Sequence, residues 1–172
     1  MRRSRAAVFL PLLLLLPALA RADERFDHRG AVGLLLGGGG EFRFNTGPNV
    51  DERGLRGVLD LGGTWAIGYN GNELLGWVRA APSASGWGWS AVAGYRGYYG
   101  YERLRTFVDL DLAAQFRPLL TAGVRVGAGV QYEITSNVGV FVGVGLQLGG
   151  GNGVVLSGEV ISGLQLRSYL LE

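Results

Sequence analysis

The chain has 172 residues, of which 48% are hydrophobic and 17% charged, and its formal net charge is +2. It contains no cysteine, which excludes disulfide bonds and thiol chemistry. The length fits a single domain, and the 31 glycines follow no Gly-X-Y period, which excludes a collagen-like chain.

The N-terminal segment, residues 1–22, has the features of a secretory signal peptide. A basic start with three arginines precedes an apolar run over residues 6–16, and Ala20-Arg21-Ala22 is an A-x-A cleavage motif. The run is too short to span a bilayer as a helix. We expect cleavage after Ala22, with Ala20 as the second choice. Cleavage removes four of the 16 basic residues and none of the 14 acidic ones, so 12 basic residues remain against 14 acidic and the net charge becomes −2. No nucleic-acid partner is therefore expected.

Eight segments with the two-residue period of β-strands follow a polar stretch. Residues 23–29 are expected to form a short periplasmic tail, and residues 30–172 a single barrel domain. None of the segments is shorter than the ~9 residues that can cross a bilayer at a tilt. The segments are residues 31–45, 55–69, 73–81, 87–99, 104–116, 119–132, 138–149 and 154–170.

Short polar or glycine-rich breaks separate these segments. The longest covers residues 46–54, and Asn70-Gly71-Asn72 is typical of a tight hairpin turn. No break has room for a crossover helix, so the strands are expected to pair antiparallel in chain order. Eight such strands close most readily into an up-and-down barrel.

The distribution of charge indicates which face of the barrel is outside. In residues 104–116 every even position except Thr106 is apolar, whereas Arg105, Asp109 and Asp111 lie at odd positions. The same inversion recurs along the chain, and it is the pattern of a barrel in lipid, with apolar side chains outward and polar ones inward. The fold class predicted is therefore an all-β, eight-stranded, antiparallel, up-and-down transmembrane β-barrel. Its inward charged residues are Glu41, Arg43, Arg56, Asp60, Arg79, Arg96, Arg105, Asp109, Asp111, Arg125, Glu159 and Arg167.

The outward aromatic residues are expected to form two belts, as they do at the two interfaces of a membrane barrel. One belt collects Phe42, Phe44, Trp87, Trp89 and Phe116, and the other Trp65, Tyr69, Tyr99 and Tyr132.

A soluble periplasmic barrel of the lipocalin type is the alternative fold, since it also has eight strands but turns its apolar face inward. The segment at residues 138–149 argues against it. One face of this segment is mostly valine and leucine, and the other is glycine, Phe141 and Gln147, which is a poor solvated surface.

Two readings of the inward charges remain open. They form either a salt-bridge network that fills a narrow lumen or a polar conduit for small solutes. The hairpin that joins residues 104–116 to 119–132 is expected to place Asp111 opposite Arg125.

No catalytic, cofactor-binding or metal site is predicted. Hydrolases that act through an activated serine need a base such as histidine, and the only histidine is His28, in the tail. A metal bound by His28 and the neighbouring acidic residues is disfavoured because these ligands are local and unstructured. The glycine-rich stretches 37–40 and 149–153 lack the Lys-Ser/Thr sequence of a phosphate-binding loop.

The combination of signal peptide, eight amphipathic strands, aromatic belts and charged lumen resembles the small outer-membrane barrels of the OmpA/OmpX type. The resemblance covers residues 30–170 and is one of architecture, and the chain departs from the usual terminal aromatic residue with Tyr169-Leu170-Leu171-Glu172. It implies an outer-membrane location, contact with outer-membrane lipid and lipopolysaccharide, and insertion by the assembly machinery. The expected role is structural or at the surface rather than enzymatic, and the oligomeric state is left open.

Overall fold

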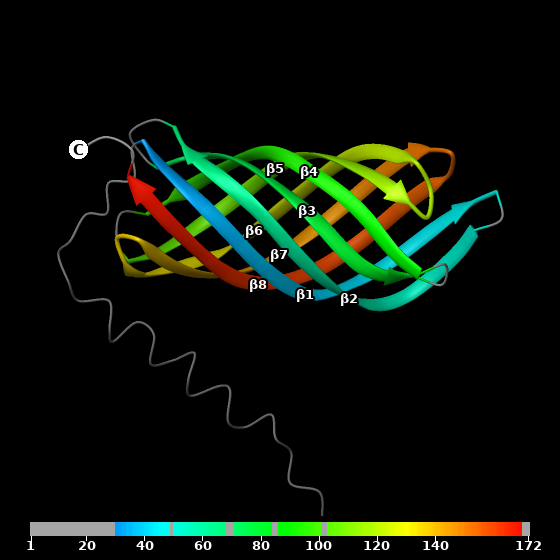
Figure 1. The fold of residues 1–172 in the computed structure, drawn as a ribbon, viewed down its shortest axis with the longest axis horizontal. Helices are drawn as coiled ribbons and strands as arrows, with labels where there is room; N and C mark the ends of the chain where they lie inside the picture. Colours follow the sequence, from blue (N-terminus) through cyan, green and yellow to red (C-terminus); the bar gives the residue numbers. More distant parts are fainter. Residues whose placement is uncertain (1–29, 49, 68–70, 84–85, 101–102, 170–172) are drawn as a thin grey trace, which may run out of the picture.

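A computed structural model describes residues 30–172 apart from 49, 68–70, 84–85, 101–102 and 170–172. The predicted signal peptide, the tail with His28, and Tyr69 lie outside these residues. The described part forms a closed barrel of eight strands in chain order (Figure 1). The strands are β1 (Ala31–Gly47), β2 (Val50–Ala66), β3 (Glu73–Ser83), β4 (Gly86–Tyr99), β5 (Leu104–Arg117), β6 (Thr121–Thr135), β7 (Val138–Gly151) and β8 (Val154–Tyr169).

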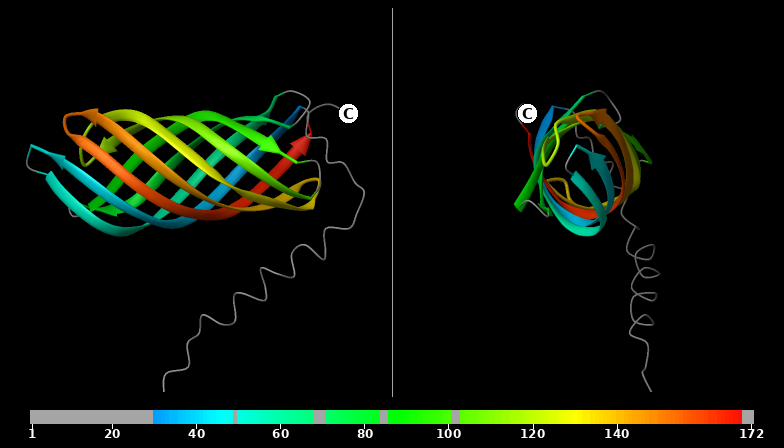
Figure 2. Two further views of the ribbon diagram at one scale, coloured as in Figure 1. Left: turned by 180° about the vertical axis from the view of Figure 1, so that it is seen from behind. Right: turned by 90° about the vertical axis from the view of Figure 1, so that its right-hand side faces the viewer.

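Antiparallel pairing of neighbours around the whole ring confirms the predicted all-β, up-and-down barrel. The ring closes between the first and last strands, which pair from Ala31 with Tyr169 to Thr46 with Val154. Closure removes free sheet edges along most of the ring, and the exception is the end of the β2–β3 ladder, which stops at Leu59 opposite Ala80. The end-on view in Figure 2 shows the ring. Among the described residues, no helix is long and apolar enough to cross a membrane.

The prediction of a loop over residues 46–54 is wrong. β1 and β2 continue pairing through this stretch, up to Gly47 opposite Val50, so the connection is a tight hairpin. This hairpin extends farther than the hairpin between β3 and β4 (Figures 1 and 2). The apolar–polar alternation breaks here because Asp51 and Arg53 are charged residues at outward positions. Backbone pairing continues all the same, because antiparallel hydrogen bonds do not require an apolar face.

Other strand ends differ from the sequence analysis by a few residues. β2 ends at Ala66 rather than at residue 69, and β6 spans Thr121–Thr135 rather than 119–132. The register within the strands agrees with the predicted parity: Asp111 is 2% exposed and the adjacent Leu112 is 70% exposed. The barrel is therefore apolar outside and polar inside.

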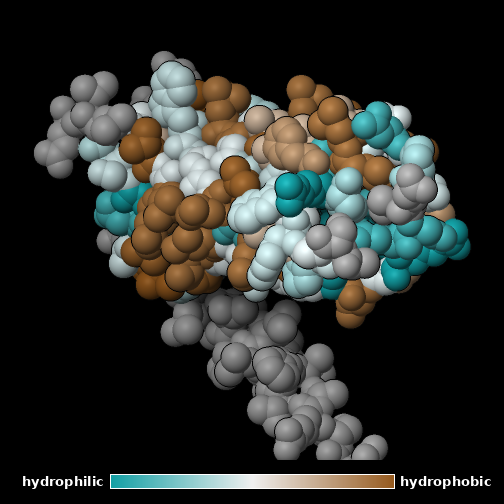
Figure 3. All heavy atoms as spheres, turned by 45° about the vertical axis from the view of Figure 1, so that its right-hand side comes forward, coloured by the Kyte–Doolittle hydropathy of each residue, from teal (hydrophilic) through white to brown (hydrophobic). Residues whose placement is uncertain are grey.

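The outer wall carries most of the large apolar side chains. In Figure 3 they spread over the barrel wall, and hydrophilic residues gather towards the end that bears the β1–β2 hairpin. Phe42, Trp87, Trp89 and Phe116 are exposed near this end, and Trp65 and Tyr99 near the other. Phe44 and Tyr132 are half-buried at the corresponding levels.

A charge on the outer wall should destabilise the barrel in lipid. Val126 lies in the middle third of β6 and is 48% exposed on the outer face. We expect Val126→Arg to lower the free energy of unfolding by about 2–4 kcal/mol, because arginine then has to sit near the midplane of the bilayer. The measurement is denaturant unfolding in lipid vesicles. The matched control Val126→Leu keeps the apolar face and should change stability by less than about 0.5 kcal/mol; equal losses for both variants would contradict an outer face in lipid.

Candidate functional site

The lumen is the candidate site, and its charged residues form three clusters along the barrel axis. The first lies in the half that bears the β1–β2 hairpin. Fully buried Glu41 accepts hydrogen bonds from Arg43 Nη2 at 2.6 Å and from Arg56 Nε at 3.0 Å. Arg43 also donates to Gln115, across the lumen on β5. One carboxylate therefore serves two guanidinium groups.

The central cluster is a chain of alternating charges. Arg96 donates to both carboxylate oxygens of Asp109 at 2.7 and 2.9 Å, a bidentate pair. Arg125 bonds Asp111 at 2.5 Å and Glu159 at 2.7 Å, and approaches Asp109 at 3.5 Å. The contacts of Arg125 link β6 to its neighbour β5 and to β8, with which β6 does not pair.

The chain of charges continues across the lumen to β3 and β2. Arg79 donates to Asp60 at 2.7 and 2.8 Å and also to Glu159. Glu159 is therefore shared by Arg79 and Arg125 and bridges strands that are not neighbours.

The third cluster closes the end near the termini. Arg167 donates to Glu73 at 3.1 Å and to Glu133 at 2.8 Å, and Arg105 donates to Glu133 at 2.6 Å. The Tyr98 hydroxyl lies at their centre and hydrogen-bonds Gln131, and amide side chains complete the packing. All of these charged groups are buried, so the described residues at this end leave no wide aqueous opening.

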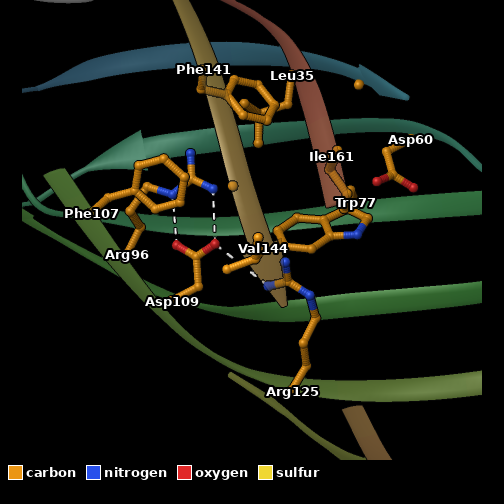
Figure 4. Close-up of a pocket in the computed structure, with 12 residues that line it drawn as sticks. Leu35, Asp60, Trp77, Arg96, Phe107, Asp109, Arg125, Phe141, Val144 and Ile161 are labelled. Carbon is orange, nitrogen blue, oxygen red and sulfur yellow. Dashed lines mark hydrogen bonds and ion pairs between the residues drawn. The ribbon is translucent and has the colours of Figure 1, made fainter. Parts of the chain in front are cut away.

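An apolar layer separates the central cluster from this end. The side chains of this layer pack around the Arg96–Asp109 pair (Figure 4), and they are Leu35, Trp77, Phe107, Phe141 and Ile161. The Arg96 guanidinium lies 3.9 Å from the centre of the Phe107 ring, and the Arg125 guanidinium 4.9 Å from that of Trp77. The space left here is about 30 Å³, which is room for roughly two or three water molecules.

Glycine makes room for the rings of this layer. A Cβ atom on Gly129 would lie 2.4 Å from Phe107 Cζ, and one on Gly163 would lie 2.6 Å from Phe141 Cζ. These approaches are too close for any other residue, because both positions also face neighbouring backbone atoms. The high glycine content therefore serves side-chain packing within a narrow barrel.

The structure places all twelve inward charged residues of the sequence analysis on the inner face. Ten are buried, Arg56 and Asp60 are half-buried, and each makes at least one ion pair. Four of the ion pairs join directly opposed residues of adjacent strands. These are Glu41 with Arg56, Asp60 with Arg79, Arg96 with Asp109, and Asp111 with Arg125.

Two buried acids of the lumen, Glu73 and Glu133, are missing from that set. Glu73 begins β3 at an inward position, and Glu133 lies just beyond the predicted end of its segment. The odd parity of each strand marks both as inward, so the signal was present. They supply the carboxylates that Arg105 and Arg167 require.

These contacts pair the charged groups of the central cluster with one another. Each arginine of the central cluster has a carboxylate partner, and Asp109 and Asp111 both face Arg125 rather than one another as an acid/base pair. The described residues contain no group of three His, Cys, Asp or Glu side chains that could hold a metal.

We expect strong coupling between Asp111 and Arg125. Asp111→Ala should cost less than Arg125→Ala, because Arg125 retains Asp109 and Glu159, whereas removal of Arg125 leaves Asp111 unpaired and takes one of two cationic partners from Asp109 and from Glu159. The double variant should cost less than the sum of the single variants by about 0.5–3 kcal/mol. Denaturant unfolding in detergent measures the cycle, and strict additivity would show that the two side chains do not interact.

Comparisons with known proteins identify the fold. No protein-family model matches the chain, and no curated protein matches it in sequence. Among solved structures, Neisserial surface protein A is 15% identical, with a TM-score of 0.57, and the match covers 80% of this chain and 96% of that one. The N-terminal β-barrel domain of Pseudomonas aeruginosa OprF is 16% identical, with a TM-score of 0.53 and coverage of 79% and 98%. The chain thus has the fold of the small eight-stranded outer-membrane barrels.

Proposed function

We propose that the protein is a non-enzymatic, integral outer-membrane barrel with a structural or surface role and a plugged lumen. The observation that carries the proposal is the combination of an apolar outer wall with an interior filled by paired charges and aromatic rings. Such a wall needs lipid around it, and such an interior leaves little space for a solute.

The outer wall supports the membrane location. Leu55, Leu112 and Leu146 are 79, 70 and 63% exposed, and comparable side chains cover all eight strands. A soluble lipocalin-like binding protein turns this face inward around its ligand. The buried position of Arg79 and Asp109 opposes that alternative.

The packing of the lumen supports a plugged barrel without catalysis. An eight-stranded barrel has an interior just wide enough for its own side chains. Glu159 and Arg79 meet across this interior, and the Phe107 and Phe141 rings meet edge to face with centres 6.5 Å apart. Each of these charges neutralises a buried partner that would otherwise be unpaired, and this is a structural role rather than an action on a substrate.

A narrow conduit is the second candidate, and one observation favours it. Several buried polar groups in the half with the β1–β2 hairpin have no hydrogen-bond partner among the described residues, including both side-chain heteroatoms of Asn45, Ser157 Oγ and Gln115 Nε2. Buried polar groups normally find a partner, and water fills this role where protein does not. This half therefore fits a wet chamber, which makes the apolar layer and the third cluster the barrier.

The location is tested by fractionation of cells that express the full chain. We expect the protein to sediment with outer membranes and to require detergent for extraction, because the exposed leucine and valine side chains cannot be solvated by water. Carbonate or urea washing serves as the control for peripheral attachment. Recovery in the soluble periplasmic fraction without detergent would overturn the proposal.

The lumen is tested by conductance in planar bilayers. We expect the folded protein to be silent, with a sixteen-stranded porin reconstituted in parallel as the positive control. Discrete openings would instead support the conduit. In that case Phe141→Ala, which removes a ring of the lumen, should change the step size, whereas Leu112→Ala on the outer wall should leave it unchanged.

A further inference from the structure

The pairing between β2 and β3 is incomplete at the end that bears the β1–β2 hairpin. Their ladder ends with Leu59 opposite Ala80. β2 begins nine residues earlier, at Val50, and β3 continues to Ser83, yet these two stretches do not pair. Pro82 has no N–H to donate to a ladder. The barrel wall therefore has a lateral gap beside the outer half of β2.

A groove of about 420 Å³ occupies this gap. Arg43 and Arg56 line it from the lumen, Arg53 and Leu55 from the outer face, and Pro82 from β3. The groove thus joins the surface of the barrel to the first charge cluster. A ligand entering from the side could reach inward guanidinium groups without passing the rim.

Arginines outnumber acids in the lining of the groove, three to two. Each of the two acids already has a donor, since Asp51 accepts from Arg53 at 3.0 Å and Glu52 accepts from Ser83. Behind it, Glu41 accepts from both Arg43 and Arg56. By contrast, Arg56 Nη1 is buried and has no partner among the described residues. An anion is the ligand class that this surplus fits.

The depth of the groove is that of the aromatic belt. In the β1–β2 ladder Arg53 is opposite Phe44 and Leu55 is opposite Phe42. The Arg53 guanidinium lies 4.5 Å from the centre of the Phe44 ring. Aromatic belts mark the level of lipid headgroups in membrane barrels, so the groove opens at the level of lipid phosphates. The tail at residues 23–29 is expected to be periplasmic, and Ala31 and Tyr169 lie at the other end of the barrel, so the groove faces the outer leaflet.

We propose that this groove binds the phosphate of a lipid headgroup of the outer leaflet. Arg53 approaches the phosphate from the membrane side and Arg56 from the lumen side, and Leu55 contacts the adjoining acyl region. Guanidinium groups suit this role because they can bind phosphate oxygens in bidentate geometry. The proposal rests on the proposed membrane location, and it adds a defined lipid site to it.

The test is equilibrium binding of bis-phosphorylated lipid A to the full-length barrel in a non-ionic detergent, followed by microscale thermophoresis. We expect Arg53→Gln and Arg56→Gln each to weaken binding about tenfold or more, as loss of a charge-assisted hydrogen bond does. The matched control Arg103→Gln removes the same charge just before β5, at the opposite end of the barrel, and should change binding less than about twofold. Arg56→Lys should retain part of the affinity.

Several outcomes would overturn the lipid site. One is equal weakening by all three glutamine variants, which indicates unspecific attraction. Another is unchanged binding of dephosphorylated lipid A, and a third is full competition by millimolar inorganic phosphate, which indicates a site for free anions. Heat-modifiable migration on gels verifies folding of each variant; if Arg56→Gln misfolds, the outward Arg53→Gln decides alone. Because binding is measured in micelles, its failure leaves the fractionation result unaffected, and the two proposals are tested separately.

Discussion

Ion pairing between opposed residues of adjacent strands is the interaction on which the interior of this barrel depends. An eight-stranded barrel has a lumen too narrow to hydrate a dozen charges separately. In four pairs of adjacent strands an arginine lies directly opposite a carboxylate, as Arg96 lies opposite Asp109. Each pair also fixes the register of its two strands, because a slip by one residue would turn the charge of the slipped strand into lipid and leave its partner unpaired. The lumen network therefore serves strand alignment as much as it fills space.

Glu159 shows how local pairs become a single plug. It lies opposite Gly145 on β7 and Glu41 on β1, neither of which can neutralise it. Its partners are Arg79 and Arg125, on strands β3 and β6. Contacts of this kind cross the lumen and link the pairs into one network. The Phe107–Phe141 layer then separates this network from the cluster around Tyr98, so that the central and third clusters lie on either side of an apolar layer.

The sequence was sufficient for strand number, parity and the directly opposed pair Asp111–Arg125, because all three follow from a two-residue period and a short hairpin. It was insufficient for contacts across the lumen. Which inward residue meets Glu159 depends on the stagger of the closed ring, which parity does not determine. Strand ends were also misplaced: the predicted segment at residues 119–132 stopped one residue short of Glu133, although the alternation continues there. At Asp51 and Arg53 the alternation fades, which turned the β1–β2 hairpin into an expected loop.

The same fading of the alternation explains why the wall opens at one place. Along most of the ring, each strand keeps both neighbours, and the outer face stays apolar. Beside Val50–Val58 the outward positions carry Asp51 and Arg53, and β3 ends in Pro82 and Ser83. Lipid tails would not tolerate unpaired backbone groups at this point, but polar headgroups and water do. The gap is therefore compatible with a membrane barrel only at headgroup level, which is where the aromatic neighbours Phe42 and Phe44 place it. An arginine-lined break in the wall at that level can bind phosphate without disturbing the closed barrel beneath.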